Sequence, residues 1–298
     1  MIKINDVFLV LIVFLSLFSA CQKLENTIDI EFDDSDNNLV VECYIEEGQP
    51  YRLMLTETKN YFEVTNICPF VRNAIVIITQ NGLKDTLKEA PYSGSGCSSI
   101  LPYWNSDSTR FFNYGSNTIC PLGLNNTFTL EVWDTLSNRQ ITATTKAISV
   151  VPITTFQTEF NQDTVAYCFL ACQDDLNTFN YYRMTLHEAS LSKRDNSTFL
   201  NYVATNPYFD QVLYDQALFS TGEVGYASGY QFYRTDTLIG TIYHIDEAYY
   251  NYLETTRAAQ NANLNPFVES SKIISNIEGG YGIFTYLAYD RDTLYIPW

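Results

Sequence analysis

The chain has 298 residues, and its 34 acidic against 17 basic side chains give it a formal net charge of −17. Such an acidic surface repels nucleic acid and anionic lipid headgroups, which excludes nucleic-acid binding and leaves any membrane attachment to a covalent lipid. Hydrophobic residues make up 46% of the sequence and charged residues only 17%, so the chain is globular and long enough for two domains, which we expect.

The first 20 residues have the three-part layout of a signal peptide. A basic start at Lys3 leads into an apolar run over residues 7–18, which is short for a spanning helix, and small residues precede Cys21. This arrangement suits a lipoprotein signal peptidase, so we predict that Cys21 carries a lipid anchor in the mature protein. The alternatives are an ordinary cleaved signal and a retained anchor.

The segment 21–38 is predicted to be an acidic tether. It carries six carboxylates against the single Lys23 and has few large apolar residues. Its run Asp33-Asp34-Ser35-Asp36 lacks the alternating ligands and the glycine of an EF-hand loop, so a solvated tether is favoured over a calcium site.

From residue 39 onward the pattern changes to short strands separated by turns. Alternating apolar residues predict strands over 39–45 and 51–58, and Asn81-Gly82 is a strong hairpin signal. The β-branched run 74–79 predicts a strand buried on both faces. Further strands are expected over 86–89, 127–133 and 140–148. This spacing is typical of an immunoglobulin-like β-sandwich over residues 39–150.

An insertion over residues 91–117 interrupts the sandwich pattern. It is rich in Gly, Ser and Asn yet carries several aromatic residues, a composition typical of binding loops because a rigid ring offers contact area at low entropy cost. Long loops in compact domains are usually functional or disordered. The alternative is that the rings fold back to cover the sandwich. The candidate ligand- or partner-binding residues are Tyr92, Tyr103, Trp104, Phe111, Phe112 and Tyr114.

The seven cysteines leave an even number for disulfides once Cys21 is set aside. Six thiols pair in too many ways for their spacing to fix the connectivity. We expect Cys43 to be a core residue. Cys168 and Cys172 share one predicted strand beyond bridging distance, so they should not pair with each other. One loop disulfide is expected among Cys68, Cys97 and Cys120.

Residues 151–298 are predicted to form a second β-rich domain with one helix. Asp246 is placed to cap a helix near 246–260, whose face with Tyr249, Leu253 and Thr256 is expected to pack. Strands are expected over 154–159, 165–172, 181–187, 230–233 and 238–243.

The supply of reactive residues argues against catalysis. His187 and His244 are the two histidines, each within an apparent strand, and no serine lies in a Gly-x-Ser-x-Gly elbow. No Cys/His cluster has the spacing of a metal site, so we expect no metal, no cofactor and no catalytic residues. A glycan-active hydrolase with a pair of carboxylates is the enzymatic alternative, because acidic residues are plentiful.

The segment 275–284, which reads SNIEGGYGIF, is preceded by Asn265-Pro266-Phe267. It resembles the C-terminal signature of domain-of-unknown-function family 4249, which consists of lipoproteins of Bacteroidota. The stretches LVVE at 39–42, NAIVI at 73–77 and TFTLEV at 127–132 follow that family's order. The motif residues, to which we assign a structural role because glycines permit close backbone approach or positive φ, are Asn276, Gly279, Gly280 and Gly282.

The resemblance implies a surface or periplasmic lipoprotein whose genes often neighbour TonB-dependent outer-membrane receptors. We therefore expect a protein lipid-anchored to the outer membrane at the cell surface. It would act as an accessory or substrate-capture subunit of a TonB-dependent transporter, with an outer-membrane β-barrel receptor as partner. The alternative is a stand-alone surface binding or adhesion module that uses the aromatic loop. The resemblance implies no reaction, and the insertion departs from the family pattern, so a binding role of that loop is not inherited.

Overall fold

The computed structural model describes residues 37–59, 69–89, 102–104, 109–123, 125–161, 165–188, 209–214, 222–264 and 272–297. These residues form a mainly β protein with a sandwich-like architecture, which confirms the predicted fold class. Within these ranges, no helix combines the length and the apolar character that crossing a bilayer requires. The predicted sites outside the described residues are the signal peptide, Cys21, most of the tether, Cys68, Tyr92 and Cys97.

The strands of the first part alternate between buried and outward-facing side chains, as period-2 sequence patterns predict. Asn81 and Gly82 have φ of 46° and 87°, so they form the predicted two-residue hairpin turn with positive φ at both positions. The strands are β1 (Leu39–Glu46), β2 (Pro50–Glu57), β3 (Ala74–Gln80), β4 (Leu83–Glu89), β5 (Pro102–Trp104), β6 (Thr109–Phe111), β7 (Tyr114–Ile119), β8 (Thr127–Asp134) and β9 (Arg139–Lys146).

Strand β3 is buried on one face only, so the prediction of burial on both faces is wrong. Val76 and Ile78 lie in the core, whereas Ile75 is 41% exposed. Ile75 faces outward opposite Trp133 of β8, which is itself 49% exposed. The continuous β-branched run therefore reflects the strand propensity of these residues. It does not indicate that both faces of the strand are buried.

The second part contains β10 (Ile153–Asn161), β11 (Val165–Gln173), β12 (Tyr181–Glu188), β13 (Phe209–Tyr214), β14 (Glu223–Ala227), β15 (Thr237–Ile245), α2 (Glu247–Leu264) and β16 (Tyr281–Tyr295). The strand predicted over 230–233 is wrong, because these residues contribute only an isolated bridge between Phe232 and Ala166. On the side of β11 away from β10, the pairing strand is β14, a few residues earlier in the chain.

Helix α2 begins as predicted. The backbone N–H of Tyr249 donates to Oδ1 of Asp246 at 2.7 Å, which is the N-cap bond. Tyr249 is buried, and Leu253 packs beside it in a cluster that includes Tyr243 and Leu287 of the sheet.

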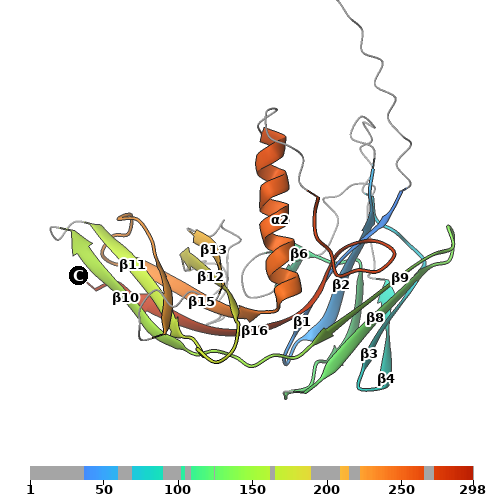
Figure 1. Ribbon diagram of the computed structural model, residues 1–298, viewed down its shortest axis with the longest axis horizontal. Coiled ribbons are helices and arrows are strands. Elements are labelled where there is room, and N and C mark those ends of the chain that lie inside the picture. Colours follow the sequence, from blue (N-terminus) through green and yellow to red (C-terminus); the bar gives the residue numbers. More distant parts are fainter. Residues whose placement is uncertain are drawn as a thin grey trace, which may run out of the picture. The chain divides into compact units, whose positions relative to one another are not determined.

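Strand β16 belongs to two pairings along its length. Residues 281–287 pair in parallel with β1, and the rest of the strand pairs antiparallel with β15. Figure 1 shows β16, in dark red, passing from the side of β1 to the side of β15. It thereby links the strands of both parts into one sheet with the order β13-β12-β15-β16-β1-β2-β7-β4-β3-β8-β9, beside a three-stranded sheet β10-β11-β14.

The segment just before β16 closes the sandwich against β9. Glu278 exchanges two backbone hydrogen bonds with Thr142, of 2.8 and 3.1 Å. The side chain of Asn276 donates to the carbonyl of Phe284 at 2.7 Å and accepts from its N–H at 3.0 Å. Gly282 has a φ of 114°, and a Cβ built there would lie 1.8 Å from the carbonyl oxygen of Val41.

The two neighbouring glycines of the motif also lie close to the backbone of other strands. A Cβ at Gly279, whose φ is 81°, would lie 2.6 Å from the carbonyl oxygen of Gln140, and one at Gly280 would lie 2.6 Å from that of Leu39. The motif therefore packs backbone against backbone at the junction of β9, β1 and β16.

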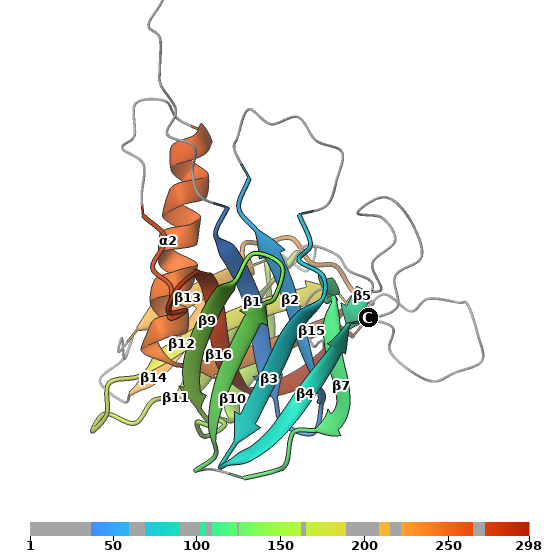
Figure 2. The same ribbon diagram turned by 90° about the vertical axis from the view of Figure 1, so that its right-hand side faces the viewer.

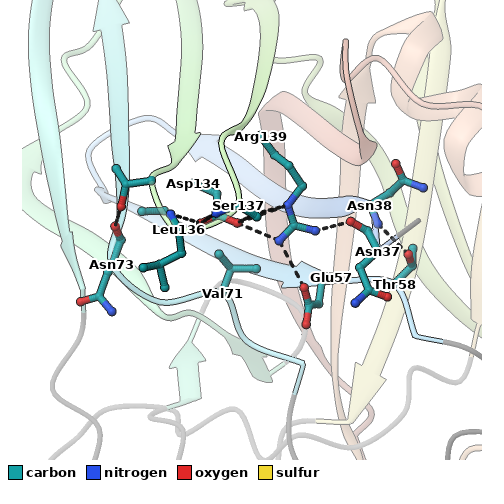
Figure 3. A network of polar contacts seen from close by, with 12 residues as sticks. Asn37, Asn38, Glu57, Thr58, Val71, Asn73, Asp134, Leu136, Ser137 and Arg139 are labelled. Atoms are coloured by element: carbon teal, nitrogen blue, oxygen red, sulfur yellow. Dashed lines mark hydrogen bonds and ion pairs between the residues drawn. The ribbon is translucent and has the colours of Figure 1, made fainter. Parts of the chain in front are cut away.

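A polar network fastens the start of β1 to the ends of β2, β8 and β9 (Figure 3). Arg139 pairs with Oδ2 of Asp134 at 2.7 Å and with Oε2 of Glu57 at 3.2 Å, and it also donates to the carbonyl of Asn37. The Asp134 side chain is only 3% exposed and also accepts from Ser137. One arginine thus holds the point at which the chain enters the fold.

The four cysteines among the described residues are free thiols and are buried. Burial raises the pKa of Cys168 and of Cys172 to about 12, and they do not pair with each other, as predicted. Cys43 lies in the core, also as predicted. Cys120, one of the three candidates for the expected loop disulfide, is a free thiol. Its backbone pairs with the β1–β2 turn, its side chain is buried in the core, and burial raises its thiol pKa to about 11.

Candidate functional site

A cleft of about 680 Å³ lies at the base of the insertion, between β4 and β7. β4 ends just before the insertion begins, and the last insertion residues form the first part of β7. The cleft is lined by Arg52, Asp85, Thr86, Lys88, Glu89, Phe112, Gly115, Ser116, Asn117 and Thr118.

The cleft exists because two neighbouring strands of the sheet diverge. β4 and β7 pair only at Lys88↔Gly115 and Glu89↔Tyr114. Figure 2 shows the two strands meeting at that end and separating toward the other. On its other side β7 stays with β2 but bulges, since residues 116–118 stand opposite one residue of β2. The bulge forms one wall of the cleft and β4 forms the other.

Arg52 holds the bulge in place. Its Nη1 donates to the carbonyl of Tyr51 at 3.0 Å and to the carbonyl of Ser116. Its guanidinium carbon lies 4.9 Å from the ring centroid of Phe112, a cation–π distance. Gly115 makes room for this arrangement, because a Cβ there would lie 2.7 Å from Arg52 Nη1.

The outer face of the cleft is locally basic in a strongly acidic protein. Lys88 is exposed and Arg52 is half-buried, both on this face. Glu89 also lines the cleft, but its carboxylate lies 4.0 Å from Arg72 Nε and accepts a hydrogen bond from the N–H of Asn73 at 3.1 Å. Thr86, Ser116 and Asn117 add hydroxyl and amide groups to the lining.

Asp85 lies two residues before the buried Leu87, so the two side chains share the core-facing side of β4. There it adds to the effects of burial and of Cys120, which together raise the pKa of Tyr51. The cleft therefore offers two cations, one aromatic ring and short polar groups to a ligand on its outer face, and its lining also includes the carboxylates of Asp85 and Glu89.

The structure separates the six predicted aromatic residues of the insertion. Phe112 lines the cleft. Tyr114 is buried in the core, where its hydroxyl accepts from the N–H of Ala74 at 3.0 Å and donates to the carbonyl of Val71 at 3.1 Å, so its role is packing. Tyr103, Trp104 and Phe111 belong to β5 and β6, which pair as a two-stranded sheet of their own.

The sequence did not indicate Arg52, Thr86 or Lys88 as site residues. Each occupies an outward position of a predicted strand, where polar residues are ordinary. The signal that could have singled out this region is Gly115 within a strand, since a strand glycine often marks close approach of another group.

The other reactive side chains do not converge. His187 pairs in register with Ile239, whereas His244 pairs with Tyr182 at the other end of β12, and its Nδ1 lies 2.8 Å from the carbonyl oxygen of Ser149. Across the described part of the chain, no three His, Cys, Asp or Glu side chains are grouped so that they could hold a metal ion.

Comparison with known proteins identifies a family but no activity. A family profile described as "Domain of unknown function (DUF4249)" matches residues 25–293. No curated protein matches the chain. A solved chain described as "Cytokine receptor complex" is 8% identical with a TM-score of 0.25, covering 86% of this chain and 96% of that one, a similarity too low to carry an inference.

Proposed function

Since the chain belongs to the DUF4249 family, we propose that it is a lipid-anchored binding subunit of the outer membrane that docks on a TonB-dependent transporter and helps to capture its substrate. Cys21 and the acidic tether would hold it at the membrane surface, and the β-rich body would present its cleft to a partner. The partner would be an outer-membrane β-barrel receptor.

The observation that carries this proposal is the β4–β7 cleft at the base of the insertion. The cleft is about 680 Å³ in volume, and two cations and an aromatic ring line it, although the net charge of the protein is −17. Binding sites are typically concave, with a few convergent polar groups. A binding role therefore accounts for a feature that packing alone does not require.

We expect a tagged form of the protein to bring a β-barrel receptor with it when it is extracted from its native membrane in mild detergent. The measurement is mass spectrometry of the purified material at native expression level. Recovery of the lipoprotein alone would contradict docking on a transporter. The Cys21→Ser variant serves as a control for the anchor, because it should leave the membrane fraction if Cys21 carries the lipid.

The alternative function is a stand-alone surface binding module. It is favoured by the separate β5–β6 sheet, which carries Tyr103 and Trp104 apart from the main sheet. In that case, binding of the cells to their target surface should persist after deletion of the receptor gene.

Replacement of both Tyr103 and Trp104 by Ala tests the hairpin under either function. If the two rings make contact with a partner, the double variant should lose receptor co-extraction or surface binding while its unfolding free energy changes by less than about 0.5 kcal/mol, as for exposed positions. Chemical denaturation checks the stability. A loss of several kcal/mol would instead assign the rings to packing.

A further inference from the structure

We propose that the β4–β7 cleft is a strand-addition site, which accepts an extended polypeptide segment of a partner that carries one acidic side chain. The segment would pair with the open edge of β4, as in known cases of β-augmentation. This inference rests on the proposed function, because it names the kind of partner segment that occupies the cleft.

The hydrogen-bond pattern of β4 shows which of its backbone groups face the cleft. The two-residue turn makes Gln80↔Leu83 a hydrogen-bonded pair, and such pairs recur at every second residue of an antiparallel ladder. Leu83, Asp85 and Leu87 therefore direct their backbone groups toward β3. Lys84, Thr86 and Lys88 direct theirs toward β7.

Among the described residues, a partner strand is present for only one of these three outward-directed residues. Lys88 pairs with Gly115, whereas the described residues include no strand that pairs with Lys84 or Thr86 on this side. Residues 83–87 thus form an open edge of about 17 Å, taken at about 3.4 Å per residue. An unpaired edge of this kind is a template for another strand.

The β7 bulge, which forms the opposite wall of the cleft, does not compete with β4 for backbone hydrogen bonds to an incoming segment. Within the β7 bulge, the carbonyl of Ser116 accepts from Arg52, and the N–H of Thr118 donates to Oγ of Ser116 at 3.1 Å. These local bonds already use two backbone groups of the bulge. An incoming segment would therefore pair with β4 and pack against β7.

The side chains of the cleft indicate the chemistry of the segment. Arg52 and Lys88 lie on the outer face, so a carboxylate on the outward side of the segment would meet two cations. Phe112 offers an apolar surface beside Arg52. A segment of uncharged β-forming residues with a single Glu satisfies these contacts and avoids long-range repulsion by the acidic protein.

Amide hydrogen exchange on the free protein provides the first test. The N–H groups of Lys84 and Thr86 should exchange rapidly, whereas those of Asp85 and Leu87, which face β3, should be protected. Slow exchange of Thr86 in the free protein would overturn the inference, because its edge would already be covered.

The second test uses a synthetic heptapeptide of alternating Thr and Val with a central Glu as probe. It should bind the mature protein and protect the Thr86 amide. Thr86→Pro removes the outward N–H without touching the β3 ladder, so it should weaken binding about tenfold, and Thr86→Val, which keeps the N–H, should bind like the wild type. The same peptide, with its central Glu kept and its other residues N-methylated, tests the pairing without altering the protein or the charge of the peptide.

Equal affinity of the Thr86→Pro and Thr86→Val variants, or of the two peptides, would overturn strand addition, as would the absence of peptide binding at millimolar concentration.

Receptor co-extraction separates this inference from the proposed function. If Thr86→Pro still brings the receptor with it, docking uses another surface and the proposed function stands. If the wild type brings no receptor, the proposed function fails, and the peptide titration still decides what the cleft binds.

Discussion

Replacing Arg139 by Ala is expected to lower the free energy of unfolding by about 3–5 kcal/mol, because it leaves the buried Asp134 carboxylate without its cation. The Asp134 side chain is 3% exposed and lies 2.7 Å from Arg139, which also holds Glu57. Chemical denaturation followed by circular dichroism measures the loss.

The matched control is Lys84→Ala, which breaks the exposed pair of Lys84 and Glu131, 3.5 Å apart. An exposed ion pair contributes at most about 1 kcal/mol. Losses of similar size in the two variants would show that the Arg139 network is no stronger than a surface pair.

The same network predicts how the effect depends on pH. Burial alone would raise the pKa of Asp134, but the hydrogen bonds from Ser137 and Arg139 outweigh it, and the pKa lies below its ordinary value. A carboxyl whose pKa is lowered on folding stabilises the protein above its unfolded pKa, and this contribution is lost as the pH falls through the folded value. The difference between wild type and Arg139→Ala should therefore be largest near neutral pH and shrink below about pH 4.

The Gly282→Ala variant is expected to lose more than about 4 kcal/mol or to fail to fold. Gly282 has a φ of 114°, and the added Cβ would lie 1.8 Å from the carbonyl oxygen of Val41, its ladder partner in β1. The parallel pairing of β16 with β1 would have to open to admit the methyl group. Thermal unfolding and limited proteolysis measure the result.

The Gly48→Ala variant separates the cost of a positive φ from the cost of a steric clash with neighbouring backbone. Gly48 also has a positive φ, of 72°, but a Cβ there would have no atom within 4 Å. It should cost only about 1–2 kcal/mol, the penalty of a left-handed backbone for an L-residue. If both variants lose equally little, the close approach at Gly282 is unimportant.

Local features of the fold could be predicted because their causes are local. The turn at Asn81-Gly82 follows from the tolerance of these residues for positive φ, and the start of α2 follows from the capping side chain of Asp246. The alternation in β1 and β2 similarly follows from burial of one sheet face.

Features that depend on distant partners could not be predicted. The β-branched run of β3 did not reveal that Ile75 faces solvent, because exposure depends on what covers the other face of the sheet. The aromatic run around Phe232 resembled a strand, but the chain turns there after β14 has already filled the place beside β11. Pairing partners of strands are not encoded in their own periodicity.

The sequence predicted the region of the chain in which the candidate site lies, but not most of the residues that line it. The insertion was singled out by its composition, and Phe112 does line the cleft. Tyr114 belongs to the same run but is buried, because strand alternation turns it toward the core. Arg52 and Thr86 became site residues through the divergence of β4 and β7, a property of two strands that no single stretch of sequence contains.

The double pairing of β16 determines when the sheet can be completed during synthesis of the chain. Val40 near the beginning of the fold lies beside Tyr281 near its end, so the contact order is high, and such topologies fold slowly. Until residues 281–295 have been synthesised, β1 lacks its parallel neighbour and β15 lacks its antiparallel one. Completion of the sheet is therefore the final step of biogenesis, and loss of the last strand would leave two unpaired edges, one in each half of the protein.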